Sequence, residues 1–182
     1  TSNNDVLIEN VIFTNNQTSS SQNDLKCLIT MDGQNNNIIN KSNFVNNDAT
    51  AICVNSTDVI VNNSILYNNT LNGYSDSGDI NLSYSNVEGG NEKFISQSGG
   101  NINFYENVID TDPIFVDDTY VVLNQESDCI DNGISDLIYQ GNLILTSNFD
   151  GFAPDMGYAE TSQPYIPNPT ILNIEDVDSD QG

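Results

Sequence analysis

Short apolar stretches recur along the chain at a nearly constant spacing, and a pair of small turn-forming residues closes each one. Four segments align without gaps, at residues 6–16, 37–47, 59–69 and 80–90, and a weaker fifth copy begins at residue 102. Their starts lie 31, 22, 21 and 22 residues apart. Two columns are always apolar: the third holds Ile8, Ile39, Val61, Leu82 and Phe104, and the eighth holds Phe13, Phe44, Leu66 and Val87.

The last two positions of each copy predict a corner in the chain. They are Asn-Asn in three copies and Gly-Gly in the fourth, and these two residue types enter the left-handed backbone region most readily. Stacked Asn side chains can also bond to one another between copies. We assign the turns to Asn15, Asn16, Asn46, Asn47, Asn68, Asn69, Gly89 and Gly90.

Strands are predicted within each copy rather than helices. Segments 59–61 and 80–82 are short, are β-branched or alternating, and have turn-forming residues on both sides, and no window shows a sustained helical period. A leucine-rich repeat has a similar period, but its Leu-x-x-Leu-x-Leu signature is missing. We therefore predict an all-β solenoid, a parallel β-helix of about five coils.

Three cysteines are present, so at most two can pair within the chain. The wide first gap holds a polar tract, residues 18–24, that is typical of a projecting loop. Strands then resume around Cys27 and, one coil later, around Cys53. If those strands stack, the two thiols are neighbours and a disulfide can form. Buried free thiols at Cys27, Cys53 and Cys129 are the commoner arrangement and are our expectation.

The second half of the chain resembles a known group. Residues 112–117 (Asp-Pro-Ile-Phe-Val-Asp), 128–133 (Asp-Cys-Ile-Asp-Asn-Gly), 150–151 and 155–160 are similar, in order, to the closing segment of secreted bacterial pectin-lyase-like proteins, including choice-of-anchor Q types. The final Tyr and Ala are exchanged relative to that pattern. The resemblance implies a right-handed parallel β-helix and a secreted, extracellular or cell-surface location. It says little about activity, because fold does not fix function.

Three parts are expected along the chain. Residues 1–111 form the coils, 112–162 form a C-terminal capping segment that covers the last apolar layer, and 163–182 form a proline-containing linker and the start of a following β module. No apolar run approaches the length of a membrane-spanning helix. Thr1 does not begin a signal peptide, so we interpret the chain as part of a longer exported protein.

The net charge limits the classes of ligand that the chain can bind. The formal net charge is −23, from 26 acidic residues against three lysines, with no histidine. Such a surface repels phosphate backbones, which excludes nucleic-acid binding by a basic footprint. Calcium is the candidate ion. Asp176, Asp178 and Asp180 alternate as in a calcium loop, although the glycine comes one place late and no downstream Glu follows. We interpret Asp110, Asp112, Asp117 and Asp118 as turn-bonding residues.

Catalytic constellations are scarce. A β-helical polysaccharide lyase needs a basic residue to remove the sugar proton, and we expect Lys26, Lys41 and Lys93 to lie on the surface. A glycosidase needs two carboxylates at a defined separation. With 26 acidic residues in the chain, the sequence alone cannot identify such a pair. Triads that use histidine cannot form.

Six Asn-x-Ser/Thr sequons, the acceptor pattern for N-glycosylation, occur at Asn16, Asn40, Asn55, Asn62, Asn68 and Asn81.

These observations favour a non-catalytic extracellular β-helical module, a stalk, adhesion or surface-structural part of a larger secreted protein. It would contact glycans (polysaccharide or other cell-surface components) or calcium, although few exposed aromatic residues stand out as stacking platforms. The alternative is the C-terminal part of a carbohydrate-active β-helix enzyme, a polysaccharide lyase or glycosidase, with its catalytic coils upstream.

Overall fold

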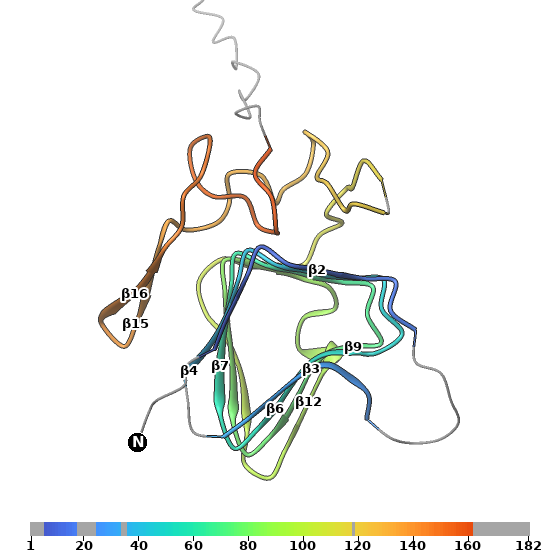
Figure 1. Ribbon diagram of the computed structural model, residues 1–182, viewed down its shortest axis with the longest axis vertical. Coiled ribbons are helices and arrows are strands. Elements are labelled where there is room, and N and C mark those ends of the chain that lie inside the picture. Colours follow the sequence, from blue (N-terminus) through green and yellow to red (C-terminus); the bar gives the residue numbers. More distant parts are fainter. Residues whose placement is uncertain (1–5, 18–24, 34–35, 118, 162–182) are drawn as a thin grey trace, which may run out of the picture.

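A computed structural model describes residues 6–17, 25–33, 36–117 and 119–161. These residues form an all-β parallel solenoid of about four turns, seen nearly end on in Figure 1. Within the described residues the only helix is the short 3-10 turn η1 (Gly90–Lys93). The predicted fold class, an all-β parallel solenoid, is confirmed.

Each of the first four coils contributes one strand to each of three parallel sheets, and the last coil contributes to the first two sheets only. The first sheet contains β1 (Val6–Glu9), β4 (Asn36–Asn40), β7 (Asp58–Asn62), β10 (Asp79–Ser83) and β13 (Asn101–Phe104). The second contains β2 (Ile12–Thr14), β5 (Asn43–Val45), β8 (Ile65–Tyr67), β11 (Ser85–Val87) and β14 (Val108–Ile109). The third contains β3 (Cys27–Asp32), β6 (Thr50–Asn55), β9 (Leu71–Asp76) and β12 (Phe94–Gln97).

The strand register in the first sheet is the register of the repeat alignment. Pairing runs from Val6 to Asn37, Val59, Ile80 and Ile102, the residues at which the five aligned copies begin. Because side chains alternate between the two faces of a strand, this register sends the third column of every copy to the same side. The alignment is thereby confirmed.

Both apolar columns point into the solenoid and form its main core. Ile39, Val61 and Leu82 are fully buried there. Phe13 and Phe44 stack across adjacent coils, with ring centroids 4.8 Å apart. The interior is thus a continuous apolar strip, to which each coil adds a few residues.

One corner of each coil, after the second sheet, turns through a left-handed residue. The φ angles are 55° at Asn15, 58° at Asn46, 52° at Asn68 and 70° at Gly89. Asn and Gly adopt this region at lower cost than other residues, which explains why the sequence alternates between these two types at this corner.

In the first three coils the residue after the turn residue is an asparagine, and these asparagines form an amide ladder. Asn16 Nδ2 donates to Asn47 Oδ1 at 2.8 Å, and Asn47 Nδ2 donates to Asn69 Oδ1 at 2.8 Å. Asn47 and Asn69 also donate to the backbone carbonyls of Phe13 and Phe44. These amides, of which Asn47 and Asn69 are buried, therefore join three coils and satisfy backbone groups that the corner would otherwise leave unpaired.

The C-terminal segment packs along the side of the solenoid. It lies outside the second sheet in Figure 1, and its buried residues Val121, Leu123 and Met156 contact Val45 and Ile65 from the outer face of that sheet. From the sequence we expected this segment to cover the end of the solenoid. These contacts lie on its side instead. A second, smaller core forms between the segment and the coils.

Outward-facing asparagines of the second sheet bind the backbone of this segment. Asn43 Nδ2 donates to the carbonyl of Val121 at 3.3 Å, and Asn43 Oδ1 accepts the amide of Tyr158 at 3.2 Å. Asn86 Nδ2 donates to the carbonyl of Thr111 at 3.0 Å. Apolar and amide residues on one sheet face thus fix the segment in register with the coils.

Lys41 corrects a second expectation, that this side chain faces solvent. It is 6 % exposed, and its Nζ donates to the carbonyl of Asn148 at 3.1 Å and pairs with the Glu160 carboxylate. The C-terminal segment covers the corner at which Lys41 lies. The sequence pattern of one repeat column could not reveal a partner 119 residues away.

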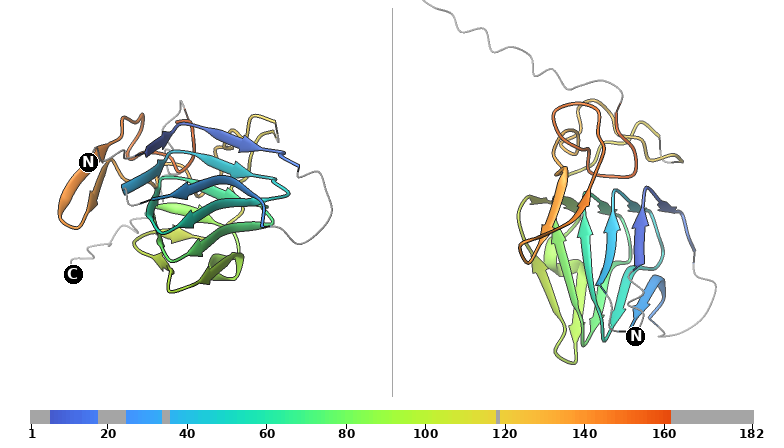
Figure 2. Two further views of the ribbon diagram at one scale, coloured as in Figure 1. Left: turned by 60° about the horizontal axis from the view of Figure 1, so that its bottom comes forward. Right: turned by 60° about the vertical axis from the view of Figure 1, so that its left-hand side comes forward.

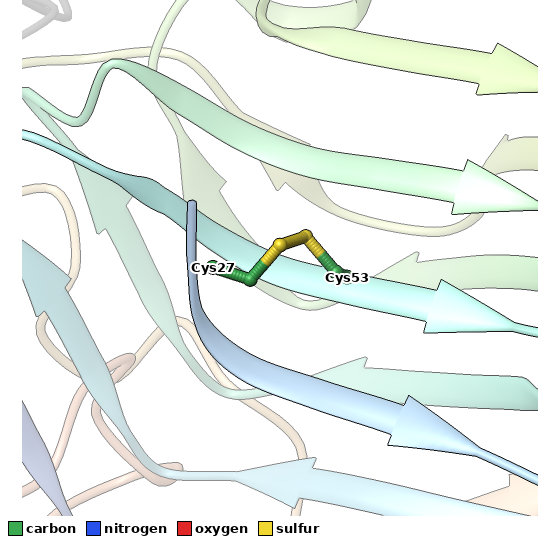
Figure 3. Close-up of a disulfide and its surroundings, with 2 residues drawn as sticks. All are labelled: Cys27 and Cys53. Atoms are coloured by element: carbon green, nitrogen blue, oxygen red, sulfur yellow. A yellow bond between two sulfur atoms is a disulfide. The ribbon is translucent and has the colours of Figure 1, made fainter. Parts of the chain in front are cut away.

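Two of the three thiols are joined, which corrects the expectation of free cysteines. Cys27 and Cys53 form a disulfide between β3 and β6, adjacent strands of the third sheet, with a Cα–Cα distance of 5.9 Å (Figure 3). Cys129 is a buried free thiol that accepts a hydrogen bond from Asn86 Nδ2. The disulfide covalently links two successive coils.

Candidate functional site

A groove runs along the outer face of the first sheet, beneath a hairpin from the C-terminal segment. The hairpin consists of β15 (Asp136–Tyr139) and β16 (Asn142–Thr146), and Figure 2 shows it crossing the strands of that sheet. The groove has a volume of about 510 Å³. Its walls come from β7, β10, the corner after β13, and the hairpin.

The hairpin forms because its turn residues accept the required backbone conformation. Gln140 and Gly141 have φ angles of 50° and 79°, and two successive left-handed residues are typical of a tight two-residue turn. Leu137 on β15 is 6 % exposed and Ile60 on β7 is 5 % exposed, and both line the groove. They provide its apolar floor, while Ile138 on the same strand is 63 % exposed.

Three tyrosines line the groove. Tyr84 occupies the corner after β10, and its hydroxyl donates to Glu106 Oε2 at 2.7 Å. Tyr105 follows β13, is 56 % exposed, and its hydroxyl donates to Asn81 Oδ1 at 3.4 Å. Tyr139 ends β15. An exposed ring with a polar tip, held beside amides and carboxylates, is a common surface for stacking on a ligand ring.

An extra residue in the last coil places Tyr105 at this position. Leu82 pairs with Phe104 and Ser85 pairs with Val108, so the last corner is one residue longer than the corner before it. The Tyr105 amide donates to the Leu82 carbonyl at 2.8 Å, and this bond fixes the corner to the preceding coil. The ring is therefore carried by an anchored backbone.

Two phenols of the groove, Tyr84 and Tyr139, have raised pKa values. The hydrogen bond to Glu106 raises the pKa of Tyr84, with burial and the charge of Glu106 acting in the same direction. Burial raises the pKa of Tyr139, helped by the nearby negative charges of Asp58 and Asp79. Both rings thus stay uncharged at neutral pH, and their hydroxyls remain hydrogen-bond donors.

The charged groups that line the groove are all acidic. Glu106 and Asp136 line it, and Asp136 Oδ1 accepts the Thr146 hydroxyl at 2.9 Å. None of the three lysines lines it. Lys41 is paired with Glu160, and Lys93 donates to the Asn69 carbonyl at 3.0 Å. The basic residue that a lyase needs is therefore not found among the residues lining this groove.

The acidic residues that the sequence singled out lie elsewhere. Asp112 and Asp117 each accept nearby backbone amides in the turns that follow them, and Asp110 accepts the amide of Gly89 at 3.1 Å. Asp118 and the candidate calcium residues Asp176, Asp178 and Asp180 lie outside the described residues. Across the part of the chain that the structure describes, no group of three or more Asp, Glu, Cys or His residues is arranged to hold a metal ion.

The sequence interpretation missed this groove, because it found few aromatic stacking platforms. A signal was present: Tyr84 and Tyr105 are 21 residues apart, one repeat period, which places them on adjacent coils. Nothing in the local sequence could show that the hairpin returns across the first sheet and adds Tyr139.

Comparison of the chain with protein-family models, with curated proteins and with solved structures finds no match. In the described ranges no helix has the length and apolar character needed to span a membrane. The geometry of the groove is therefore the basis for the functional argument.

Proposed function

We propose that this chain is a non-catalytic, extracellular β-solenoid module that binds glycan in the tyrosine groove on its first sheet. It would serve as a stalk, adhesion or surface-structural part of a larger secreted protein. The finer family assignment, a right-handed pectin-lyase-like helix of the choice-of-anchor Q kind, is part of this proposal and rests on the motifs in residues 112–160.

One observation carries the proposal: the groove combines the exposed ring of Tyr105 and two half-buried tyrosine rings with polar groups held on the surface of the solenoid. Tyr105, Tyr139 and Tyr84 provide faces for sugar rings, and Ser83 and Gln140 add hydroxyl and amide groups at the rim. Ligand sites typically combine apolar walls with a few directed polar groups. Most other asparagines of the coils bond within ladders or to the C-terminal segment, whereas this region is open to a ligand.

The disulfide supports the extracellular location. Disulfides form and persist mainly in oxidising compartments such as the exterior of the cell, and they are rare in the cytosol. Cys27 and Cys53 are bonded between neighbouring coils. The strongly acidic surface is also compatible with a protein that must stay soluble while exposed to solvent on all sides.

The chemistry of the groove supports a binding role. Abstraction of a sugar proton needs a base, and the raised pKa values of Tyr84 and Tyr139 make their phenolates scarce at neutral pH. The chain has no histidine to take that part. The carboxylates of Glu106 and Asp136 accept the hydroxyls of Tyr84 and Thr146, and the tyrosine rings can stack on a ligand.

A binding panel tests this proposal. The wild-type chain is titrated calorimetrically with neutral glucan, hexosamine and uronate oligosaccharides, and the Tyr105→Ala variant is titrated with those that bind. We expect at least one oligosaccharide to bind, with affinity about fivefold to tenfold weaker in Tyr105→Ala, because loss of one stacking ring removes about 1–1.4 kcal/mol. Tyr120→Ala is the matched control, since Tyr120 is 65 % exposed and lies away from the groove.

Two results would overturn the proposal. Absence of binding across the panel rejects glycan recognition, and so does an equal loss of affinity in the Tyr120→Ala control. Chain cleavage, or new absorbance from an unsaturated uronate product, rejects the non-catalytic role.

A further inference from the structure

The charged residues that line the groove are both acidic, and charge can add a selectivity that stacking rings alone do not provide. We propose that it selects glycans bearing protonated amino groups, such as oligomers of glucosamine, over neutral and uronate glycans. This inference rests on the proposed glycan binding and names the ligand class of that same groove.

Carboxylates surround the rings on more than one side. Glu106 stands beside Tyr84 at the corner of the last coils, and Asp136 begins the hairpin strand that ends at Tyr139. Both carboxylates line the groove and are exposed. A bound amine would therefore meet negative charge from the coil side and from the hairpin side.

Two further aspartates reinforce the field at one end of the groove. Asp58 and Asp79 begin successive strands of the first sheet, and Asp58 Oδ1 accepts the amide of Asp79 at 2.9 Å. Both lie near enough to Tyr139 for their charges to act on its phenol. The negative potential thus extends along the sheet beyond the groove itself.

No positive charge balances these groups within the groove. Lysines do not line it, arginine and histidine do not occur in the chain, and the net charge of −23 adds a long-range potential of the same sign. A uronate would be repelled by this field, and a neutral sugar would be indifferent to it. A protonated amine gains both from the carboxylates and from the faces of the neutral tyrosine rings, which attract cations.

A matched pair of ligands isolates this charge term. The probes are a glucosamine oligomer with free amines and the same oligomer fully N-acetylated, with a uronate oligomer as the opposite charge. Calorimetric titration of the full chain at low salt and mildly acidic pH, where the sugar amines are protonated, should show the free-amine form binding at least about tenfold more tightly than the acetylated form, and no binding of the uronate. Raising the salt concentration should narrow this difference, since exposed charges are screened.

Charge-neutralising variants test which residues are responsible. Glu106→Gln and Asp136→Asn keep an oxygen for the hydrogen bonds from Tyr84 and Thr146 but remove one negative charge each. We expect each to weaken binding of the free-amine oligomer about threefold to fivefold, and to leave any binding of the acetylated oligomer unchanged. Glu126→Gln is the control, because it makes the same charge change on an exposed turn outside the groove.

The outcomes separate this inference from the function on which it rests. Equal binding of the free-amine and acetylated oligomers, sensitive to Tyr105→Ala, overturns the amine selectivity and keeps glycan binding. Binding of an oligolysine peptide as tightly as the free-amine oligomer overturns the assignment to a glycan. An equal effect of Glu126→Gln shows that the net charge, and not the groove, attracts the ligand, and this also overturns the inference.

Discussion

The amide ladder at the Asn-Asn corner can be tested by removing its central side chain. Asn47 is 3 % exposed and takes part in four hydrogen bonds: it accepts from the amide and the Nδ2 of Asn16, and it donates to the Phe13 carbonyl and to Asn69 Oδ1. Asn47→Ala deletes all four bonds at once. It leaves buried partners that water cannot easily reach.

The expected cost follows from those bonds. A neutral hydrogen bond contributes about 1 kcal/mol net, and a buried group left unpaired costs about 1–3 kcal/mol. Asn16 is exposed and can bond to water instead, so its two bonds count for less. We therefore expect Asn47→Ala to lower the free energy of unfolding by about 3–5 kcal/mol, a large share of the about 5–15 kcal/mol typical of a domain.

Urea unfolding, followed by far-ultraviolet circular dichroism, measures this cost. With a denaturant slope of about 2 kcal/mol per molar, the midpoint should fall by about 2 M. The neighbouring variant Asn46→Gly is the matched control. Its φ of 58° suits glycine, and it loses only the exposed bond from Asn68, so we expect a loss below about 1 kcal/mol. A midpoint for Asn47→Ala within about 0.5 M of wild type, which corresponds to about 1 kcal/mol, would show that the ladder contributes little to stability.

Three further predictions concern the cysteines and the buried ion pair. The Cys27–Cys53 disulfide closes a loop with a sequence separation of 26 residues, and its reduction should lower the free energy of unfolding by about 3–4 kcal/mol. Urea unfolding with reductant should therefore show a lower midpoint, and an unchanged midpoint contradicts this. Burial raises the pKa of Cys129 to about 11, so the native thiol should resist alkylation at pH 8 and react after denaturation, as followed by mass spectrometry; fast native labelling contradicts this. Glu160→Gln leaves the buried Lys41 charge unpaired and should lower the free energy of unfolding by about 3–5 kcal/mol. The double variant Lys41→Met with Glu160→Gln should recover part of that loss. No recovery in the double variant would argue against a stabilising ion pair.

The fold could be predicted from the sequence because every coil of the solenoid needs the same residue types at the same positions. Every coil needs apolar residues at the same interior positions, and every corner needs residues that tolerate a left-handed backbone. The columns that contain Ile39 and Phe44 therefore gave the register without knowledge of the structure. Local requirements, copied from coil to coil, are visible in one sequence.

Contacts made by the non-repeating C-terminal segment were not readable in the same way. Lys41 was expected in solvent, because its column carries polar residues in other coils, but Glu160 covers it. The outer face of the second sheet carried a usable sign: Ile12 and Ile65 are apolar at positions that should face outward, which indicates a covering element. The sequence could not show which segment covers that face, because a chain without repeats gives no register.

The same limit applies to the groove. On its coil side, the repeat places Tyr84 and Tyr105 on adjacent coils, and the longer corner of the last coil sets where Tyr105 lies. Its hairpin side depends on where residues 136–146 return to the coils, and only the folded chain shows this position. The sequence can therefore predict the part of the site that lies on the repeating coils, but not the part that the hairpin contributes.

The most direct measurement is a titration of the isotope-labelled chain with the free-amine glucosamine oligomer, followed by chemical-shift changes of its backbone amides. We expect shifts concentrated at Tyr84, Tyr105, Glu106 and the hairpin residues 136–140, with the second sheet and its covering segment unaffected. Shifts centred elsewhere on the solenoid, or no shifts at saturating oligomer, would contradict glycan binding in this groove.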